Sequence, residues 1–286
     1  MPYLIVVSVL WGFSFVIIKG SLVSLDSNFV SFARLLLSFL IFAPFIRPGG
    51  IRLPDKVRFL WIGGVQFGLM YVAYVASYRY LPAHVIALMT TTTPLFVTLF
   101  NDMGERRVHK TFLAAALLAV AGGAAIEFPD QPSTMNVYGI LLIQLSNAAF
   151  AFGQIAYRRL MACRAALRDK DVFGFMYGGA VVVAGFCSWR TTDFRQLSIQ
   201  PDQALALLYL GLVASGVCFF LWNLGARKVN EGVLAVMNNL KIPVGVVASL
   251  LILKESAGYV RLVFGCALFA AALWVNERGW RKKQFR

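Results

Sequence analysis

The chain has 286 residues, of which 59% are hydrophobic and only 14% are charged, and its mean hydropathy is +0.71. About a quarter of the residues of a soluble domain are charged, so this composition excludes an ordinary soluble protein and indicates a protein that exposes apolar surface to lipid. The net charge of +14 would fit nucleic acid binding, but the basic residues lie in short clusters between apolar runs, so we expect no nucleic acid partner.

Ten apolar segments follow one another along the chain, each long enough to cross a bilayer as a helix. Their length excludes the shorter, alternating strands of a membrane barrel, and a helix satisfies its own backbone polar groups, as lipid requires. The first segment is not expected to be a cleaved signal peptide, because it lacks a basic region and a second span follows closely. The segments are Tyr3–Leu22, Asn28–Ile46, Phe59–Tyr80, Ala83–Asn101, Thr111–Phe128, Val137–Tyr157, Val172–Trp189, Ala204–Ala226, Gly232–Leu253 and Val260–Asn276.

Basic residues in the connections predict the orientation of these spans. If the N-terminus is cytoplasmic, the cytoplasmic side holds 19 Lys and Arg residues and the opposite side holds 6. The positive-inside rule then places both termini in the cytoplasm. We therefore expect an all-α integral membrane protein with ten transmembrane helices, located in the bacterial inner membrane.

The fourth and ninth segments share an order of motifs: a short apolar start, a polar stretch, a proline and a later glutamate. In the fourth these are Ala87-Leu88-Met89, four threonines, Pro94 and Gly104-Glu105-Arg106; in the ninth they are Ala235-Val236-Met237, Asn238-Asn239, Pro243 and Lys254-Glu255. We predict two five-helix repeats, residues 1–131 and 132–286. An odd number of spans per repeat requires the second to insert upside down, and inverted repeats are typical of secondary transporters with a substrate site at the repeat interface.

Several motifs, in the same order over nearly the whole chain, resemble those of the drug/metabolite transporter superfamily. They are Trp11-Gly12-Phe13-Ser14-Phe15 followed by Lys19, Phe32-Ala33-Arg34, Pro94 followed by Gly104-Glu105-Arg106, and Pro243 followed by Lys254-Glu255. The resemblance implies ten helices in two inverted halves and, usually, metabolite export. Within this family the chain most resembles the aromatic amino acid exporter branch. The polar Asn238, Asn239 and Lys241 depart from the apolar run of the wider family. This departure counts against transferring the substrate of that branch to this chain.

Lys241 is predicted to lie deep inside the ninth segment. It follows Gly232 by nine residues, which places it roughly 14 Å along a helix. A lysine at that depth costs about 2.5 kcal/mol or more and usually faces a cavity or a partner, although snorkelling to the interface is the alternative. All thirteen acidic residues fall at segment ends or in connections. A substrate carboxylate could therefore pair with Lys241, and Asn238 shares its helix face.

Further polar and aromatic side chains are expected to line a central cavity with these two. They come from the first, third, fourth, sixth and eighth segments: Trp11, Gln66, Tyr74, Tyr78, His84, Thr91, Asn147, Gln154 and Trp222. The alternative is that the polar groups join neighbouring helices and that the aromatic rings form an interfacial belt. Pro94 and Pro243 each remove a helix hydrogen bond and could act as hinges or as fixed bends. Arg34 lies only a turn or two into the second segment, where interfacial anchoring or pairing with Asp26 is expected.

These features predict a secondary transporter that exports small organic metabolites by alternating access through a cavity between the repeats. The expected substrates are amino acids, with aromatic ones among them. The expected partners of the transporter are a small-molecule substrate and the lipid bilayer. The alternatives are a multidrug or organic-cation exporter, which Lys241 disfavours, a passive channel and an integral membrane enzyme. His84 and His109 are far apart and the four cysteines show no CxxC spacing, so we expect no metal, no cofactor and no enzyme activity.

Overall fold

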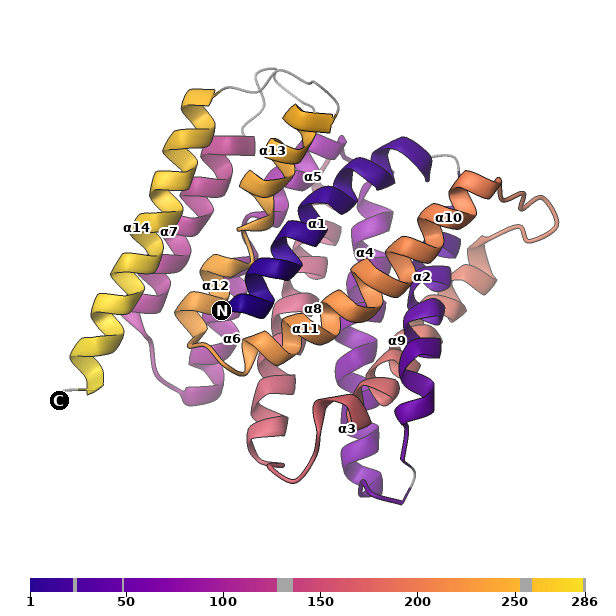
Figure 1. Ribbon diagram of the computed structural model, residues 1–286, viewed down its shortest axis with the longest axis horizontal. Helices are drawn as coiled ribbons and strands as arrows, with labels where there is room; N and C mark the ends of the chain where they lie inside the picture. Colours follow the sequence, from indigo (N-terminus) through magenta and orange to yellow (C-terminus); the bar gives the residue numbers. More distant parts are fainter. Residues whose placement is uncertain (23–24, 48, 128–135, 253–258, 285–286) are drawn as a thin grey trace.

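The computed structural model describes residues 1–22, 25–47, 49–127, 136–252 and 259–284 (Figure 1), and the side chains of 13–21, 83–84, 248–252 and 280–284 lie outside this description. The described residues form helices and turns with no strand. Seven helical runs among them are long and apolar enough to cross a membrane. An all-helical membrane protein is therefore confirmed, whereas the count of ten spans stays a prediction.

Six of the expected spans are single helices. They are α1 (Pro2–Ser21), α2 (Ser27–Phe42, followed by the short 3-10 turn η1, Ala43–Phe45), α7 (Lys110–Glu127), α8 (Val137–Ala162), α9 (Asp169–Thr191) and α14 (Tyr259–Gln284). Asp26 starts α2 and Asn136 starts α8, since each side chain accepts backbone N–H groups of the first turn. Within α1, the stretch Pro2–Gly12 is apolar.

Two further spans contain a wide π-helical segment in the middle. The third span consists of α3 (Leu53–Gly63), η2 (Gly64–Leu69) and α4 (Met70–Ser77); the eighth consists of α10 (Pro201–Tyr209), η3 (Leu210–Val217) and α11 (Cys218–Ala226). A π segment frees backbone carbonyls, and here side chains bind them. Ser38 donates to the carbonyl of Gly211 at 2.8 Å, and Tyr177 donates to those of Ser215 and Gly216 at 2.6 and 2.8 Å. Such segments often occur at functional sites.

The expected fourth and ninth spans are interrupted instead of continuous. The fourth is divided into α5 (Ala83–Thr90) and α6 (Thr93–Glu105), and the ninth into α12 (Glu231–Met237) and α13 (Lys241–Ile252). Pro94 and Pro243 lie in the first turn of α6 and of α13, where a missing N–H costs little. The prolines therefore begin the second half-helix and do not bend a continuous one.

Side chains near the two interruptions bind backbone carbonyls there. Thr93 donates its hydroxyl to the carbonyl of Thr90 at 2.8 Å, the group left free by the absent N–H of Pro94. Asn238 donates to the carbonyl of Leu234 at 2.8 Å. Asn239 reaches across to the other interruption and donates to the carbonyl of Thr91 at 2.8 Å. The two helix breaks therefore touch each other.

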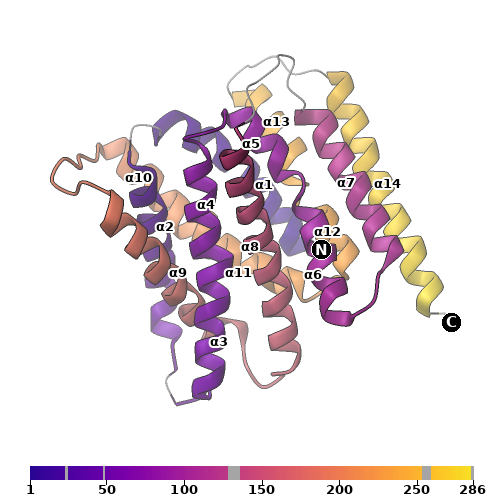
Figure 2. The same ribbon diagram turned by 180° about the vertical axis from the view of Figure 1, so that it is seen from behind.

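Helix contacts in the first predicted repeat have counterparts in the second, where α8 corresponds to α1, α9 to α2, η3 to η2 and α13 to α6. α1 packs on α13 as α8 packs on α6, and α2 packs on η3 as α9 packs on η2. α7 and α14 lie side by side along one edge of the molecule in both views (Figures 1 and 2), with Gly122 and Gly265 facing each other closely. The end of α14 lies at the same end of the bundle as the α6–α7 and α8–α9 connections.

Glycines let α3 and α9 approach at backbone distance. A Cβ atom on Gly63 would overlap the carbonyl oxygen of Met176, and a Cβ atom on Gly179 would overlap the carbonyl oxygen of Leu60. Small residues at such crossings are typical of membrane helices, because close backbone approach supplies the van der Waals contact that holds them together.

Candidate functional site

A cavity of about 130 Å³ lies among the helices next to the two interruptions. Its walls come from α1, α2, α4, α5, α6, α8, α11 and α13, which include parts of both sequence halves. A larger cavity of about 220 Å³ lies at the α6–α7 connection beside His109, away from the breaks. The smaller cavity is lined by Trp11, Arg34, Met70, Tyr71, Tyr74, Thr90, Thr93, Ser146, Asn147, Phe150, Phe219 and Lys241.

Lys241 faces this cavity, as the sequence predicts. It is the first residue of α13, directly after the interruption, and its Nζ lies 5.8 Å from the ring centroid of Trp11. None of the described residues that line the cavity is acidic. The positive end of the α13 dipole adds to the charge of the ammonium group. The cavity therefore presents a positive potential and favours an anionic group.

Arg34 also lines the cavity, which corrects the expectation that it anchors at the interface or pairs with Asp26. The residue is only 8% exposed, and its Nε donates to the hydroxyl of Ser215 at 3.1 Å. Asp26 is engaged elsewhere: it caps α2 at Phe29 and accepts a hydrogen bond of 2.6 Å from Thr192. Hydropathy alone could not place Arg34, because Ser215 comes from a segment 181 residues later in the chain.

Asn147 and Tyr74 supply neutral polar groups. Asn147 donates through Nδ2 to the carbonyl of Met89 at 2.8 Å and to the hydroxyl of Thr92 at 3.1 Å, at the end of α5. Its Oδ1 accepts no hydrogen bond from the described residues and remains available to a ligand. The hydroxyls of Tyr74 and Tyr78 lie 2.8 Å apart, and Tyr78 is exposed beyond the cavity.

The other amides chosen from the sequence lie outside the cavity wall and join helices. Gln66 donates to Asn223 at 3.2 Å, and Gln154 donates to Asn238 at 3.2 Å. Gln66 and Tyr74 were both expected to line the cavity, but only Tyr74 does; Gln66 lies within η2 and Tyr74 beyond it. The extra residue in a π turn rotates the following side chains around the axis, so spacing at 3.6 residues per turn does not hold across it.

The remaining candidates lie beside the cavity. Thr91 is buried at the interruption, where its hydroxyl donates to the carbonyl of Leu88 at 2.6 Å. Trp222 is fully buried, and its ring centroid lies 5.0 Å from that of Trp11. The His84 side chain lies outside the described residues. Whether these residues bind substrate stays a prediction.

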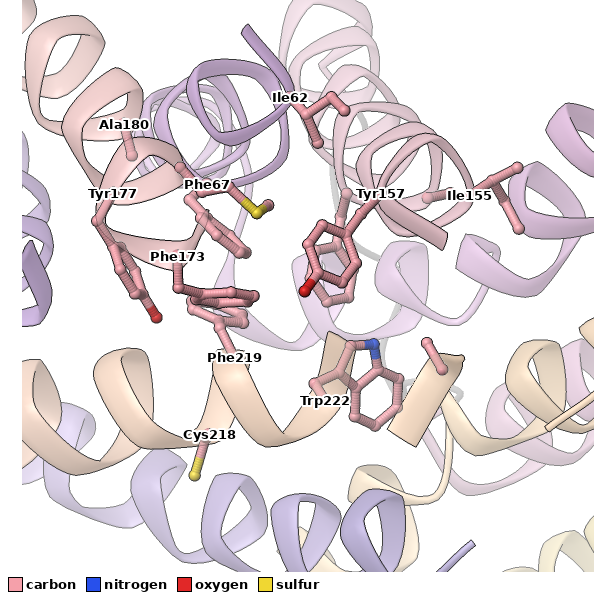
Figure 3. Close-up of a cluster of buried hydrophobic side chains, with 14 of the residues drawn as sticks. Ile62, Phe67, Ile155, Tyr157, Phe173, Tyr177, Ala180, Cys218, Phe219 and Trp222 are labelled. Carbon is pink, nitrogen blue, oxygen red and sulfur yellow. The ribbon is translucent and has the colours of Figure 1, made fainter. Parts of the chain in front are cut away.

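An aromatic cluster of buried side chains adjoins the cavity and shares Phe219 with its wall (Figure 3). Phe219, which lines the cavity, stacks on Phe67 with ring centroids 4.7 Å apart, and the cluster continues through Phe173 and Tyr157. Tyr157 donates to Asp169 at 2.5 Å, and Arg227 donates to the same carboxylate at 2.6 Å. The cluster thus extends from Phe219 in the cavity wall to Asp169 at the start of α9.

Comparisons with known proteins give a consistent result. A family model described as the EamA-like transporter family matches residues 1–127 and again 137–277. A probable biotin transporter of Pseudomonas aeruginosa is 39% identical, covering 99% of both chains, and the biotin transporter of Escherichia coli K12 is 35% identical over 97% of this chain and 93% of its own. A more distant relative, a probable amino-acid metabolite efflux pump of Escherichia coli K12, is 23% identical over 97% and 95% of the two chains. A crystal structure with 18% identity superposes with a TM-score of 0.79, covering 96% of this chain and 97% of the other, and shares its fold.

Proposed function

Because the chain belongs to the EamA-like transporter family, within the drug/metabolite transporter superfamily, we propose that it carries biotin or a close analogue across the bacterial membrane. It is a multi-pass protein of the inner membrane. Two relatives that match it over nearly their whole length are named as biotin transporters. Transport of a small metabolite follows from the family, and the identity of that metabolite is the proposal.

The observation that carries the proposal is a cavity with Lys241 and no acidic residue among its described lining. Biotin has one carboxylate at the end of a flexible chain and a neutral ureido ring at the other end. Lys241 would pair with the carboxylate. Trp11, Tyr71 and Tyr74 offer flat apolar contact for the fused rings, and the free Oδ1 of Asn147 can accept a ureido N–H.

The same cavity disfavours the other substrates considered. A zwitterionic amino acid would bring an ammonium group into a space that already holds Lys241 and Arg34, and the described lining offers no carboxylate to pair with that ammonium group. A buried unpaired ionic group costs several kcal/mol. An organic cation meets the same repulsion. In this proposal the amino acid substrate expected from the sequence is therefore replaced by a molecule with one carboxylate and no positive charge.

We further propose that transport proceeds by alternating access between two inverted halves, residues 1–131 and 132–286, with both termini cytoplasmic. The family model matches each half separately, and helices interrupted at corresponding positions of two repeats are typical of transporter binding sites. Pro94 and Pro243, at the starts of α6 and α13, are the proposed hinges. In the proposed orientation the aromatic cluster lies between the cavity and the cytoplasmic end.

Uptake of radiolabelled biotin by proteoliposomes tests the proposal. Lys241→Met removes the charge and keeps the length, and one charge-assisted hydrogen bond is worth about 1.5–3 kcal/mol, so apparent affinity should fall roughly ten- to a hundredfold. Biotin amide, which lacks the carboxylate, should compete weakly with biotin in the wild type, and the variant should bind it about as well as the wild type does. Lys170→Met, an exposed lysine at the start of α9, is the matched control and should transport normally.

Two results would count against the proposal. If wild-type liposomes accumulate no biotin above empty ones, the substrate is wrong. If flux rises linearly with biotin concentration and competitors have no effect, the protein behaves as a channel and not as a carrier.

A further inference from the structure

We propose that Arg34 is a second anion-binding residue and that the substrate carboxylate binds between Arg34 and Lys241. This inference rests on the proposed function and identifies how its site holds the substrate. The two cations line one cavity of about 130 Å³, and a carboxylate has two oxygens, one for each cation.

The guanidinium group of Arg34 is fixed by contacts with Ser215 and Tyr71. Its Nε donates to Ser215 at 3.1 Å, and its central carbon lies 4.9 Å from the ring centroid of Tyr71. The hydroxyl of Tyr71 lies 3.0 Å from that of Ser215, so the three side chains brace one another. An arginine fixed in this way presents its remaining N–H groups in one direction.

Those remaining groups have no hydrogen-bond partner among the described residues. The two terminal nitrogens of Arg34 make no hydrogen bond with the described residues, and no ion pair with Arg34 occurs among them either. Yet the residue is more than nine-tenths buried. A buried charge without a partner is strongly unfavourable, whereas a guanidinium edge matches the two oxygens of a carboxylate. The missing partner is therefore best explained as the ligand itself.

The two cations come from different parts of the chain. Arg34 belongs to α2 in the first region matched by the family model, and Lys241 belongs to α13 in the second. Without substrate, two like charges face one small space and repel each other. A carboxylate between them replaces repulsion with two attractions. Binding of the anion would thus draw α2 and α13 together, which is the change that closure over a substrate requires.

Binding of biotin and of biotin amide to the purified protein, measured by calorimetry, tests the inference. Arg34→Gln should weaken biotin roughly tenfold or more and leave the affinity for the amide nearly unchanged. The double variant with Lys241→Met should lose much less than the product of the two single losses, because both residues bind one carboxylate. Arg79→Gln, an exposed arginine beyond α4, is the control and should match the wild type.

The outcomes separate this inference from the proposed function. If the wild type binds biotin and Arg34→Gln binds it equally well, the role of Arg34 is refuted while the function stands. If the losses in the double variant simply multiply, the residues bind different groups and the shared carboxylate is refuted. If the wild type does not bind biotin, the proposed function itself fails. Should Arg34→Gln not fold, Arg34→Lys keeps the charge without the forked geometry; it should still weaken biotin selectively over the amide, and an equal effect on both ligands would refute the inference.

Discussion

Gly179 and Gly178 are neighbours in α9 with opposite surroundings. A Cβ atom on Gly179 would overlap the carbonyl oxygen of Leu60 in α3, and a backbone atom inside a helix cannot move aside. A Cβ atom on Gly178 would meet the tip of the Leu60 side chain at 3.5 Å and that of Phe39 at 3.7 Å, which are ordinary contacts. Alanine at the two positions should therefore have opposite effects on stability.

The two variants share one contribution to the free energy of unfolding and differ in a second. Both gain up to about 1 kcal/mol because alanine favours the helix over glycine. Only Gly179→Ala also forces α3 and α9 apart, and overpacking of this kind costs about 1–3 kcal/mol or more. At roughly 2–4 °C per kcal/mol, the melting temperatures should differ by about 5 °C, with Gly178→Ala at or above the wild type.

Thermal unfolding of the purified variants in one detergent, followed by size-exclusion fluorescence, would measure this difference. The reciprocal variant Gly63→Ala, which would meet the carbonyl of Met176, should behave like Gly179→Ala. Equal melting temperatures for the Gly178 and Gly179 variants would refute the close α3–α9 crossing described above.

Two further predictions concern orientation and the helix interruptions. Cys163 is exposed in the α8–α9 connection, which is expected on the cytoplasmic side. In a variant whose other three cysteines are replaced by serine, Cys163 should therefore react with an impermeant maleimide only after cells are permeabilised. Ser133→Cys in the same background, at a position outside the described residues, should react in intact cells; the opposite pattern would invert the topology. Asn239→Leu removes the hydrogen bond to the carbonyl of Thr91 and should cost about 1–3 kcal/mol of stability, whereas an unchanged melting temperature would show that the two breaks are not coupled through this amide.

The sequence was sufficient to predict the helical class and the approximate span positions, because membrane helices must be long and apolar. α8 begins at Val137 as expected, and α11 ends at Ala226 as expected. The third span begins at Leu53, six residues before the predicted Phe59, because Asp55 and its basic neighbours lower local hydropathy. Asp55 is nevertheless buried by ion pairs, including one of 2.9 Å to Arg164 from the α8–α9 connection.

The site was only partly predictable. Lys241 was found because its depth within a span can be counted along the chain. Arg34 and Tyr71 were missed because their burial depends on Ser215, which the fold brings from the eighth span. Gln154 and Asn238 look like ligand-binding residues in sequence, yet they bind each other across two helices. A polar residue at mid-span thus indicates burial, and only tertiary contacts tell whether a ligand or a helix is its partner.

The paired π segments bear on the history of the chain. A shift of 149 residues, the spacing of Pro94 and Pro243, carries residues 64–69 onto 213–218, which overlap η3 (Leu210–Val217). A π segment amounts to one residue inserted into an ordinary helix. If the halves arose from one ancestral gene, a single insertion before duplication accounts for both segments. On the proposed division into two inverted five-helix halves, that ancestor would have been a five-span protein that already carried the widened helix, and two oppositely oriented copies would have paired to form the cavity.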